Sequence, residues 1–563
     1  MGHRPSLDAV SAMSRSAACP GQVRTPVSPQ NSDLTIAVVY ALAVPNRHRI
    51  GTGTIARLLN ADWLSAECCL LSAECQVLPF PYTANSSMPA SDPANTAALH
   101  AHELPRALGV SHATAIVVGT IIGSGIFLVP SEMMQAVGSA KLVYLAWLVG
   151  GLLSFFGALT YAELGAMKPQ AGGEYVYVRD AYGPLGGFLY AWTTVLISKP
   201  ASLATITTGF VRILGNFSAF SFLSHRLLMT PLTITYGQIA AISAVAFISL
   251  LNYIGVKKAG EFQLVFTLLK IAIILGVVVV CFGYRGGAGW SNFATTFLGA
   301  KGGLAGFMAA LIAALWAYDG WNDLNMVAGE IRQPDRNIPI ALIAGVAVVG
   351  ALYVLVNAGV QYVLPASTIA ASQRPASDAI ALVAGALGAS IVSAGMALSM
   401  LVTLNGSTMS GARVPFAAAR DGYFYSSIAR VHPRFLTPSA AIVLQFFLTF
   451  ALLIAGGSFS QFFTLAIFAE WLFYMITAST VFVFRRREPD APRPYKVWGY
   501  PVVPILFVCA SATLLIYTFV QNLRGSSSDS SAILVGMPVI ILAGIPVFYY
   551  FRWKRMAESS VNH

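Results

Sequence analysis

Glycines and polar residues interrupt two long apolar stretches of the sequence, and these residues have the types and spacing to bind a solute. Residues 119–127 are GTIIGSGIF and residues 315–323 are LWAYDGWND. Each glycine lowers helix stability by about 1 kcal/mol relative to alanine, and peptide groups without hydrogen-bond partners are costly in hydrocarbon. A helix broken at this depth persists only where protein or a polar solute satisfies the freed groups. The two patterns predict a cavity between interrupted helices.

The freed peptide groups predict a solute that carries both charges. N–H groups near Ser124 and Gly125, at the start of a helix, favour an anion through hydrogen bonds and the helix dipole. Carbonyl groups freed at Ile121, Trp316 and Asp319 favour a cation. An α-amino acid carries a carboxylate and an ammonium two bonds apart, so we expect it to bind both sets together.

Helix packing is the alternative explanation for the glycines. Gly119 and Gly123 form a pair of small residues four positions apart, which is a common contact between membrane helices. The second interruption favours a binding site, because paired interruptions at corresponding positions of two halves are typical of inverted-repeat transporters.

The elements that must position these residues are membrane-spanning helices. Hydrophobic residues make up 56% of the 563 residues and charged residues only 10%, whereas soluble domains contain about 25% charged residues. The first 100 residues contain six basic and six acidic side chains, so the net charge of +11 arises in the connectors beyond them. This distribution excludes a concentrated nucleic-acid-binding surface.

Apolar stretches of about 20 residues, enough to cross a ~30 Å hydrocarbon core, recur after residue 110. We predict an all-α membrane protein with twelve transmembrane helices, in which helices 1–5 and 6–10 form a 5+5 inverted repeat with discontinuous helices 1 and 6, followed by helices 11 and 12. The predicted spans are 113–137, 142–167, 184–211, 233–253, 262–283, 303–329, 338–361, 380–406, 438–456, 460–484, 500–520 and 532–551.

The chain divides into two predicted parts. Residues 1–105 form a mostly disordered N-terminal extension that contains no apolar run long enough to cross a bilayer, and one interpretation is that Met88 is the true initiator. Residues 106–563 form the twelve-helix domain, with repeat one at 111–283, repeat two at 302–484 and additional helices at 500–551.

Basic residues in the connectors predict the orientation. If the N-terminus is cytoplasmic, the inner connectors and the C-terminal tail contain 18 Lys or Arg residues and the outer connectors at most seven. The excess of positive charge on the cytoplasmic side then places both termini in the cytoplasm, in a multi-pass protein of the inner or plasma membrane.

Charged residues within the predicted spans need a partner or a function, because a charge at mid-span costs at least ~2.5–3.5 kcal/mol. Lys270 can replace a sodium ion by donating hydrogen bonds to the carbonyls freed in helix 1, or it can be a purely structural cation. Asp319 is either a counter-ion for a basic side chain or a cap for backbone near Gly320, and we favour the cap. Glu470 is either a protonated hydrogen-bond donor or a partner for Lys199.

The chain resembles the L-type amino-acid transporter (LAT) family of the amino acid/polyamine/organocation (APC) superfamily. The resemblance is based on the two interrupted motifs together with YAELG at 161–165, VFTLLK at 265–270, RNIPIAL at 336–342 and ARDG at 419–422. It implies sodium-independent carriage of amino acids, commonly by exchange, with the α-carboxylate and α-amino groups held by the backbone of helices 1 and 6.

The resemblance also implies roles for individual side chains. Trp316 stands where the family has an aromatic gate, Asn322 lies beside the amino-group site, and Lys270 matches the family's lysine on helix 5. The predicted substrate-binding residues are Ile121, Gly123, Ser124, Gly125, Trp316, Asp319 and Asn322, and the predicted gating or coupling residues are Trp316, Lys270 and Glu470.

Two departures from the family pattern affect partners and substrates. Animal members join a heavy subunit through a cysteine after helix 3, but residues 212–232 contain no cysteine, so we expect no disulfide-linked heavy subunit. Asp319 stands where many carriers of neutral substrates have a small uncharged residue. The expected partners are an amino-acid substrate and membrane lipid, with no nucleic acid, metal or cofactor, and the sequence does not specify an oligomeric state.

These patterns predict a sodium-independent secondary transporter, an exchanger or permease of neutral amino acids that works by alternating access. A proton-coupled or cationic-amino-acid permease of the same superfamily and, from another class, a membrane amino-acid sensor are the alternatives. An enzyme is disfavoured, because the sequence has no recognisable nucleophile and base pair or metal-ligand cluster at membrane depth.

Overall fold

The structure, a computed structural model, describes residues 104–123, 125–215, 217–228, 234–456, 459–524 and 528–561. The expected disordered extension at 1–105 lies almost entirely outside the described residues, as does Ser124.

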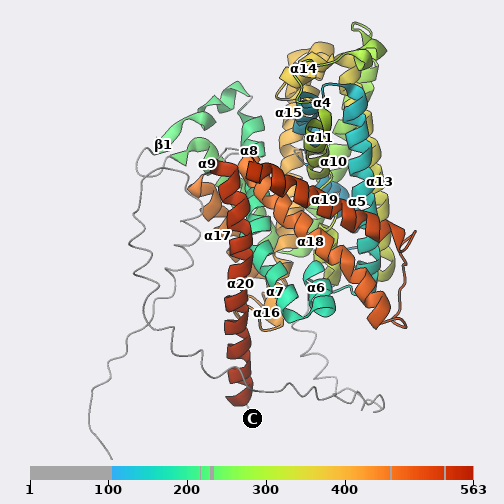
Figure 1. The fold of residues 1–563 in the computed structure, drawn as a ribbon. Coiled ribbons are helices and arrows are strands. Elements are labelled where there is room, and N and C mark those ends of the chain that lie inside the picture. The colour runs from blue at the N-terminus through green and yellow to red at the C-terminus, as the bar shows by residue number, and fades with distance from the viewer. Residues whose placement is uncertain are drawn as a thin grey trace, which may run out of the picture. The chain divides into compact units, whose positions relative to one another are not determined.

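Helices make up most of the described chain, which confirms the all-α class (Figure 1). The helices of the first half are α3 (Val110–Ile121), α4 (Gly125–Val137), α5 (Ala140–Met167), α6 (Glu174–Tyr182), α7 (Pro184–Thr193), the π-helical turn η1 (Thr194–Ser198), α8 (Lys199–Leu214), α9 (Tyr236–Tyr253) and α10 (Val256–Phe282).

A short irregular segment connects α8 to α9. It contains the 3₁₀ turn η2 (Ser218–Ser224) and an antiparallel pair of strands, β1 (Arg226–Leu228) and β2 (Ile234–Thr235), in which Arg226 is opposite Thr235. Thr235 then begins α9 with a capping box: its side chain accepts from the backbone N–H of Gln238, and the Gln238 side chain accepts from the backbone N–H of Thr235.

The second half begins with the 3₁₀ turn η3 (Gly289–Ala294). It continues with α11 (Gly303–Ala317), α12 (Asp323–Met326), the 3₁₀ turn η4 (Ala328–Glu330), α13 (Pro334–Val363), α14 (Ala366–Ala371), α15 (Pro375–Gly411), α16 (Arg413–Arg420), α17 (Ser439–Ala455), α18 (Phe459–Arg487), α19 (Val502–Arg524) and α20 (Ser528–Val561).

Eight helical stretches of the described chain are long and apolar enough to cross a membrane: Val110–Val137, Ala140–Met167, Tyr236–Tyr253, Val256–Phe282, Pro334–Val363, Pro375–Arg420, Leu465–Arg487 and Val502–Val520. Two shorter apolar helices, α11 and α17, lie in the predicted sixth and ninth spans. Leu148, Leu268 and Val279 are 60–71% exposed, as expected for side chains that face lipid. The chain is therefore a multi-pass helical membrane protein.

Both interruptions occur where the sequence predicts them. The first follows the end of α3 at Ile121, and the second separates α11 from α12 at residues 318–322. Gly320 has a φ of 106°, in the region that strongly favours glycine. A Cβ atom on Gly125 would lie 2.7 Å from the Cα atom of Ala317, so glycine allows the two interrupted helices to approach each other closely.

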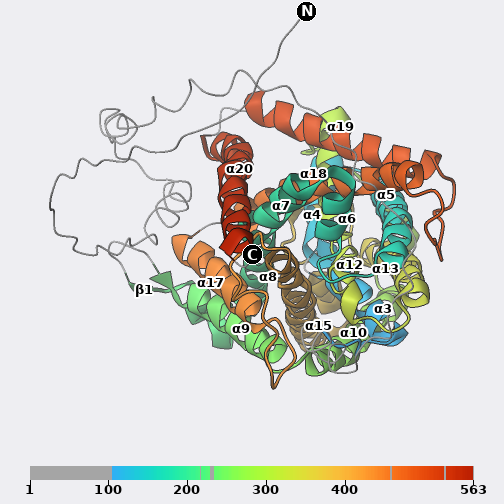
Figure 2. The ribbon, with the colours of Figure 1, turned by 90° about the horizontal axis from the view of Figure 1, so that it is seen from below.

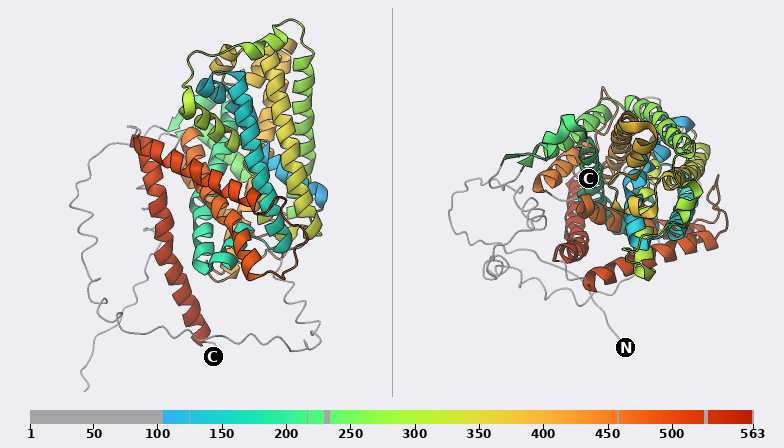
Figure 3. Two further views of the ribbon diagram at one scale, coloured as in Figure 1. Left: turned by 45° about the vertical axis from the view of Figure 1, so that its right-hand side comes forward. Right: turned by 90° about the horizontal axis from the view of Figure 1, so that it is seen from above.

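The interrupted helices are surrounded by long, continuous ones. The helix α3 packs against α10, α13 and α15, which also pack against one another (Figure 2). The helix α4 packs against α11. Elsewhere, α19 packs on α18 and α5, and α20 packs on α7 (Figure 3). The contacts with α10, α13 and α15 bring donor side chains to the break after α3.

Candidate functional site

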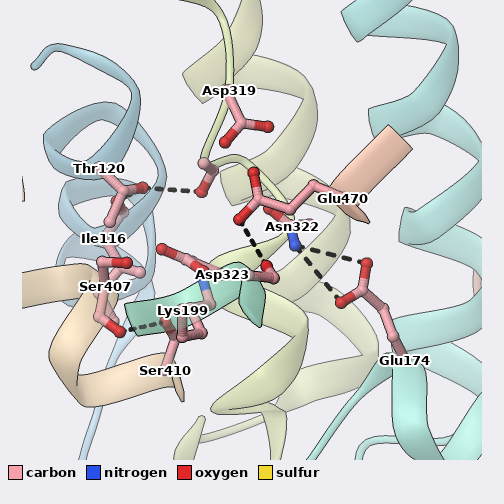
Figure 4. Close-up of polar contacts among 12 residues, drawn as sticks. Ile116, Thr120, Glu174, Lys199, Asp319, Asn322, Asp323, Ser407, Ser410 and Glu470 are labelled. Carbon is pink, nitrogen blue, oxygen red and sulfur yellow. Dashed lines mark hydrogen bonds and ion pairs between the residues drawn. The ribbon is translucent and has the colours of Figure 1, made fainter. Parts of the chain in front are cut away.

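A small cavity lies at the two interruptions. Residues from both breaks line it together with polar residues of α8 and α15. The lining residues are Thr120, Ile121, Gly123, Gly125, Lys199, Ser202, Ile206, Trp316, Asp319, Gly320, Asp323, Thr403 and Ser407. The Thr120 hydroxyl lies 2.8 Å from the carbonyl oxygen of Gly320, so the two broken helices also touch directly (Figure 4).

The cavity brings together most of the predicted substrate-binding residues. Ile121, Gly123, Gly125, Trp316 and Asp319 all line it, whereas Ser124 lies outside the described residues. Asn322 lines a second, smaller cavity instead. That second cavity is also lined by Glu174, Tyr190, Ser198, Glu470 and Tyr474. The binding roles of these residues stay predictions.

Lys270 ties α10 to the break in the first helix, as the sequence predicts. The residue is 1% exposed, and its Nζ atom donates to the carbonyl oxygens of Gly119 at 2.8 Å, Ile122 at 2.6 Å and Ser399 at 3.3 Å. The break frees the Gly119 carbonyl because the N–H of Gly123 bonds to Ile121 instead. An ammonium group therefore occupies the place between carbonyls where a small cation could bind.

Hydroxyl groups of α15 and α13 also donate hydrogen bonds to carbonyl groups at the breaks. The Ser399 hydroxyl donates to the Ile122 carbonyl at 2.9 Å. The Tyr353 hydroxyl lies 2.9 Å from the carbonyl oxygen of Ile121 and 2.8 Å from that of Ala317. Tyr353 has one hydroxyl hydrogen, so it can donate to only one of these two carbonyls at a time. It thus connects the end of α3 to the end of α11.

A buried ion pair joins α8 to α12 at the wall of the cavity. Lys199 and Asp323 have side chains that are 5% and 2% exposed, and the Nζ atom of Lys199 lies 2.5 Å from Oδ1 of Asp323 (Figure 4). The sequence offered Glu470 as the alternative partner of Lys199. Glu470 instead accepts a hydrogen bond of 2.9 Å from Ser198, the last residue of the π-helical turn, a conformation often found at functional sites.

Asp319 does not cap the backbone at the second break. Its described contacts include no backbone N–H group, and its Oδ1 atom accepts a hydrogen bond of 2.8 Å from Tyr474 on α18. Backbone groups close the turn without it, because the N–H of Asp323 bonds to the carbonyl of Gly320. The interpretation of Asp319 as a backbone cap is therefore wrong, although the residue lines the cavity.

Trp316 lies at the cavity beside an aromatic residue of α18. It is 8% exposed, and its ring lies edge-on to that of Phe463 with 5.0 Å between the ring centroids. This position, next to the break after α11, is compatible with a gate. The gating role stays a prediction.

Two further ion pairs, one buried and one half-buried, were not predicted from the sequence. Arg413 makes a bidentate pair with Glu330, with distances of 2.6 and 3.0 Å, which joins α16 to η4. Arg485 makes one with Glu163, with distances of 2.9 and 2.6 Å, which joins α18 to α5. The partners are 83 and 322 residues apart, so no local pattern indicates them. Among the described residues, no group of three or more His, Cys, Asp or Glu side chains could hold a metal ion.

Comparison with known proteins agrees with this geometry. The family model described as amino acid permease matches residues 108–545. The serine/threonine exchanger SteT of Bacillus subtilis is 32% identical over 461 residues, which cover 81% of this chain and 98% of SteT. The human b(0,+)-type amino acid transporter 1 is also 32% identical, over 82% of this chain and 91% of the relative.

A third relative is the rabbit large neutral amino acids transporter small subunit 2, which is 32% identical over 79% of this chain and 80% of its own length. The chain therefore belongs to the amino acid permease family, as an L-type (LAT) member of the APC superfamily. It is a membrane transporter of amino acids and not an enzyme.

Proposed function

We propose that this amino acid permease is a sodium-independent exchanger of neutral amino acids that works by alternating access. The cavity at the two breaks supports this function, because Gly123 and Gly125 line it at the start of α4 and Ile121 and Trp316 line it at the ends of α3 and α11. The substrate carboxylate would bind at the start of α4, where N–H groups are unpaired by helix geometry. The substrate ammonium would bind the freed carbonyls.

The polar lining of the cavity supports small or polar side chains as the preferred substrates. Ser202, Thr403 and Ser407 add hydroxyl groups to the wall, and Trp316 supplies a large apolar surface next to them. Among the relatives, SteT is named as a serine/threonine exchanger. Serine, threonine and alanine are therefore the first substrates to test.

Lys270 supports sodium independence. Its ammonium already contacts the carbonyls of Gly119 and Ile122, so a sodium ion bound there would meet a positive charge within a few ångströms. Coulomb repulsion at such a distance is large in a buried site. We therefore assign Lys270 the role of a fixed cation that stabilises the break, with Trp316 as the gate over the substrate.

The proposed architecture has twelve crossings, with 5+5 inverted repeats and helices 11 and 12 outside the mechanism. The helices α3 to α10 would form repeat one and α11 to α18 repeat two. Both termini would lie in the cytoplasm, on the side of the more basic connectors. No disulfide-linked heavy subunit is included, since residues 212–232 contain no cysteine.

Transport of cationic amino acids is the second candidate function. Asp319 and Asp323 both line the cavity, and only Asp323 is paired with Lys199. Asp319 accepts a hydrogen bond from Tyr474 but forms no ion pair among the described residues, so a basic side chain of a substrate would supply its counter-ion.

Counterflow in proteoliposomes tests the proposed function. Purified protein in vesicles loaded with unlabelled serine should take up labelled serine faster than it does in empty vesicles, in sodium-free buffer. Uptake that requires sodium, or that is no faster after preloading, would contradict sodium-independent exchange. Competition by lysine and arginine against labelled serine distinguishes the two substrate classes.

A further inference from the structure

Four carboxyl side chains and one lysine gather next to the substrate cavity. They are Glu174 on α6, Asp319 and Asp323 at the second break, Glu470 on α18 and Lys199 on α8 (Figure 4). Glu174, Asp323, Glu470 and Lys199 are 1–7% exposed. If all five were ionised, four negative charges would face one positive charge. Uncompensated charge inside a membrane protein is costly, so the cluster needs another source of positive charge.

Two of the four carboxyl groups are compensated within the structure. Asp323 forms its ion pair with Lys199. Glu174 accepts hydrogen bonds from Tyr161 at 2.8 Å, from Tyr190 and from Asn322 at 3.4 Å. These donors partly offset the cost of burying the Glu174 carboxyl group.

Glu470 and Asp319 lack equivalent compensation. Oε1 of Glu470 accepts from Ser198, but Oε2 has no hydrogen-bond partner, although this residue is 93% buried and lines the smaller cavity. The Tyr474 hydroxyl oxygen lies 2.8 Å from Oδ1 of Asp319 and 2.8 Å from Oδ1 of Asn322, so its single hydrogen can be donated to only one of them at a time. In Figure 4 the carboxyl group of Glu470 on α18 points toward that of Asp319 at the second break.

Two neighbouring carboxyl groups are stable when they share one proton, because a protonated oxygen donates to the other carboxylate whereas two carboxylates repel. We propose that Asp319 and Glu470 together bind one proton and that exchange of a neutral amino acid requires this proton. The inference rests on the proposed exchange function. The unpartnered oxygen of Glu470 is the proton site, and loss of the proton leaves an unpaired negative charge between α18 and the second break.

Charged and polar groups from the surrounding helices determine the electrostatic environment of Asp319 and Glu470. Lys199 on α8 is the one cation of the cluster, and Asp323 and Glu174 add negative charge from α12 and α6. Tyr474 on α18, Tyr190 on α7 and Tyr161 on α5 supply neutral hydroxyl donors. The helices α19 and α20 contribute apolar side chains next to the chain neighbours of Glu470. Phe507 of α19 packs on Trp471, and Met537 of α20 belongs to the same hydrophobic cluster as Ala469.

The pH dependence of serine exchange tests the proton site. Vesicles with the same buffer inside and outside, between about pH 5.5 and 8.5, are preloaded with serine and assayed with labelled serine. A required proton predicts that native exchange falls up to about tenfold per pH unit once the pair ionises. Glu470→Gln keeps a neutral side chain with a hydrogen-bond donor, so its exchange should be independent of pH. Glu261→Gln, whose carboxyl group is 57% exposed on α10, is the matched control and should keep the native profile.

The outcomes separate this inference from the exchange function. A flat native profile, or a Glu470→Gln profile that equals the native one, would overturn the proton site and leave exchange intact. A folded Glu470→Gln protein that exchanges at no pH would also overturn it, because glutamine would then not replace the protonated acid. Absence of native exchange at every pH would contradict the proposed function itself. If Glu470→Gln does not fold, Glu470→Asp is measured in its place. A pH profile of exchange that differs from the native one supports the proton site, and a profile equal to the native one overturns it.

Discussion

The ammonium of Lys270 lies 2.6 Å from the carbonyl oxygen of Ile122, the first residue after α3 ends. This contact places a charge from the middle of α10 at the point where the first interrupted helix loses its own hydrogen bonds. It shows that the break is solvated by protein groups, as a helix interruption at membrane depth requires.

Replacement of Lys270 by alanine should destabilise the protein and abolish exchange. Each buried acceptor that loses its donor costs about 1–3 kcal/mol, and Lys270 serves three carbonyls. Thermal unfolding of the purified protein, followed by tryptophan fluorescence, measures the change. Lys257→Ala removes a lysine of the same helix that is 82% exposed and should leave the melting temperature unchanged. Equal melting temperatures for Lys270→Ala and the native protein would contradict this role.

Replacement of Gly125 by alanine should prevent the close approach of the two breaks. The added Cβ atom would lie 2.7 Å from the backbone of Ala317, a distance that requires the helices to move apart. We expect exchange activity to be lost. Gly276→Ala on α10 is the control, since an added Cβ there meets no atom within 4 Å and alanine favours the helix by about 1 kcal/mol. Full activity of Gly125→Ala would show that the approach is dispensable.

Replacement of Trp316 by alanine should slow exchange roughly tenfold or more, because a gate that no longer covers the substrate fails to sequester it from water. Trp316→Phe keeps an aromatic ring against Phe463 and should retain much of the activity. Initial rates of labelled serine exchange measure both variants. Trp498→Ala, at a residue that is 67% exposed, is the control. A gate at Trp316 is excluded if Trp316→Ala and Trp498→Ala have the same rate.

Replacement of Asp319 by asparagine should reduce competition by lysine and arginine relative to alanine if cationic substrates are carried. Loss of one ion pair of about 1.4 kcal/mol corresponds to a tenfold loss of affinity. Competition curves against labelled alanine measure the selectivity. The control is Asp490→Asn, at an exposed acidic residue. Unchanged selectivity would remove Asp319 from the recognition of cationic side chains.

The Lys199–Asp323 pair should show strong coupling in a double-mutant cycle. Asp323→Ala alone leaves a buried lysine without its partner, which typically costs about 3–5 kcal/mol. Lys199→Ala/Asp323→Ala removes both charges and should restore part of the lost stability. Melting temperatures of the two single variants, the double variant and the native protein measure the coupling. Additive losses would mean that the two side chains do not stabilise each other.

Sequence reasoning located both breaks because their causes are local. Glycines at 119, 123 and 125 and the polar run after Ala317 weaken a helix wherever they occur, so the predicted interruptions agree with the ends of α3 and α11. The same reasoning placed five of the seven predicted binding residues at the cavity. The family resemblance followed from these two interrupted motifs and from four others along the chain.

The sequence alone did not identify the partners of the charged residues. The sequence left Glu470 as one candidate partner for Lys199, but in the tertiary structure Lys199 forms its ion pair with Asp323. The interpretation of Asp319 as a backbone cap failed for the same reason, since its donor Tyr474 is 155 residues away. The sequence did not indicate that Tyr353 contacts both breaks, because a single tyrosine in an apolar helix is common.

The amino-acid sequence by itself determined that the chain is a helical membrane protein and where two of its helices break, and it predicted an amino acid as the solute. These properties depend on hydropathy and helix propensity, which act over a few turns of chain. Only the tertiary structure decided which side chains solvate the breaks and which charges face each other. Such contacts depend on the packing of helices that are far apart in the sequence, and hydrophobic periodicity does not encode their relative rotation or depth.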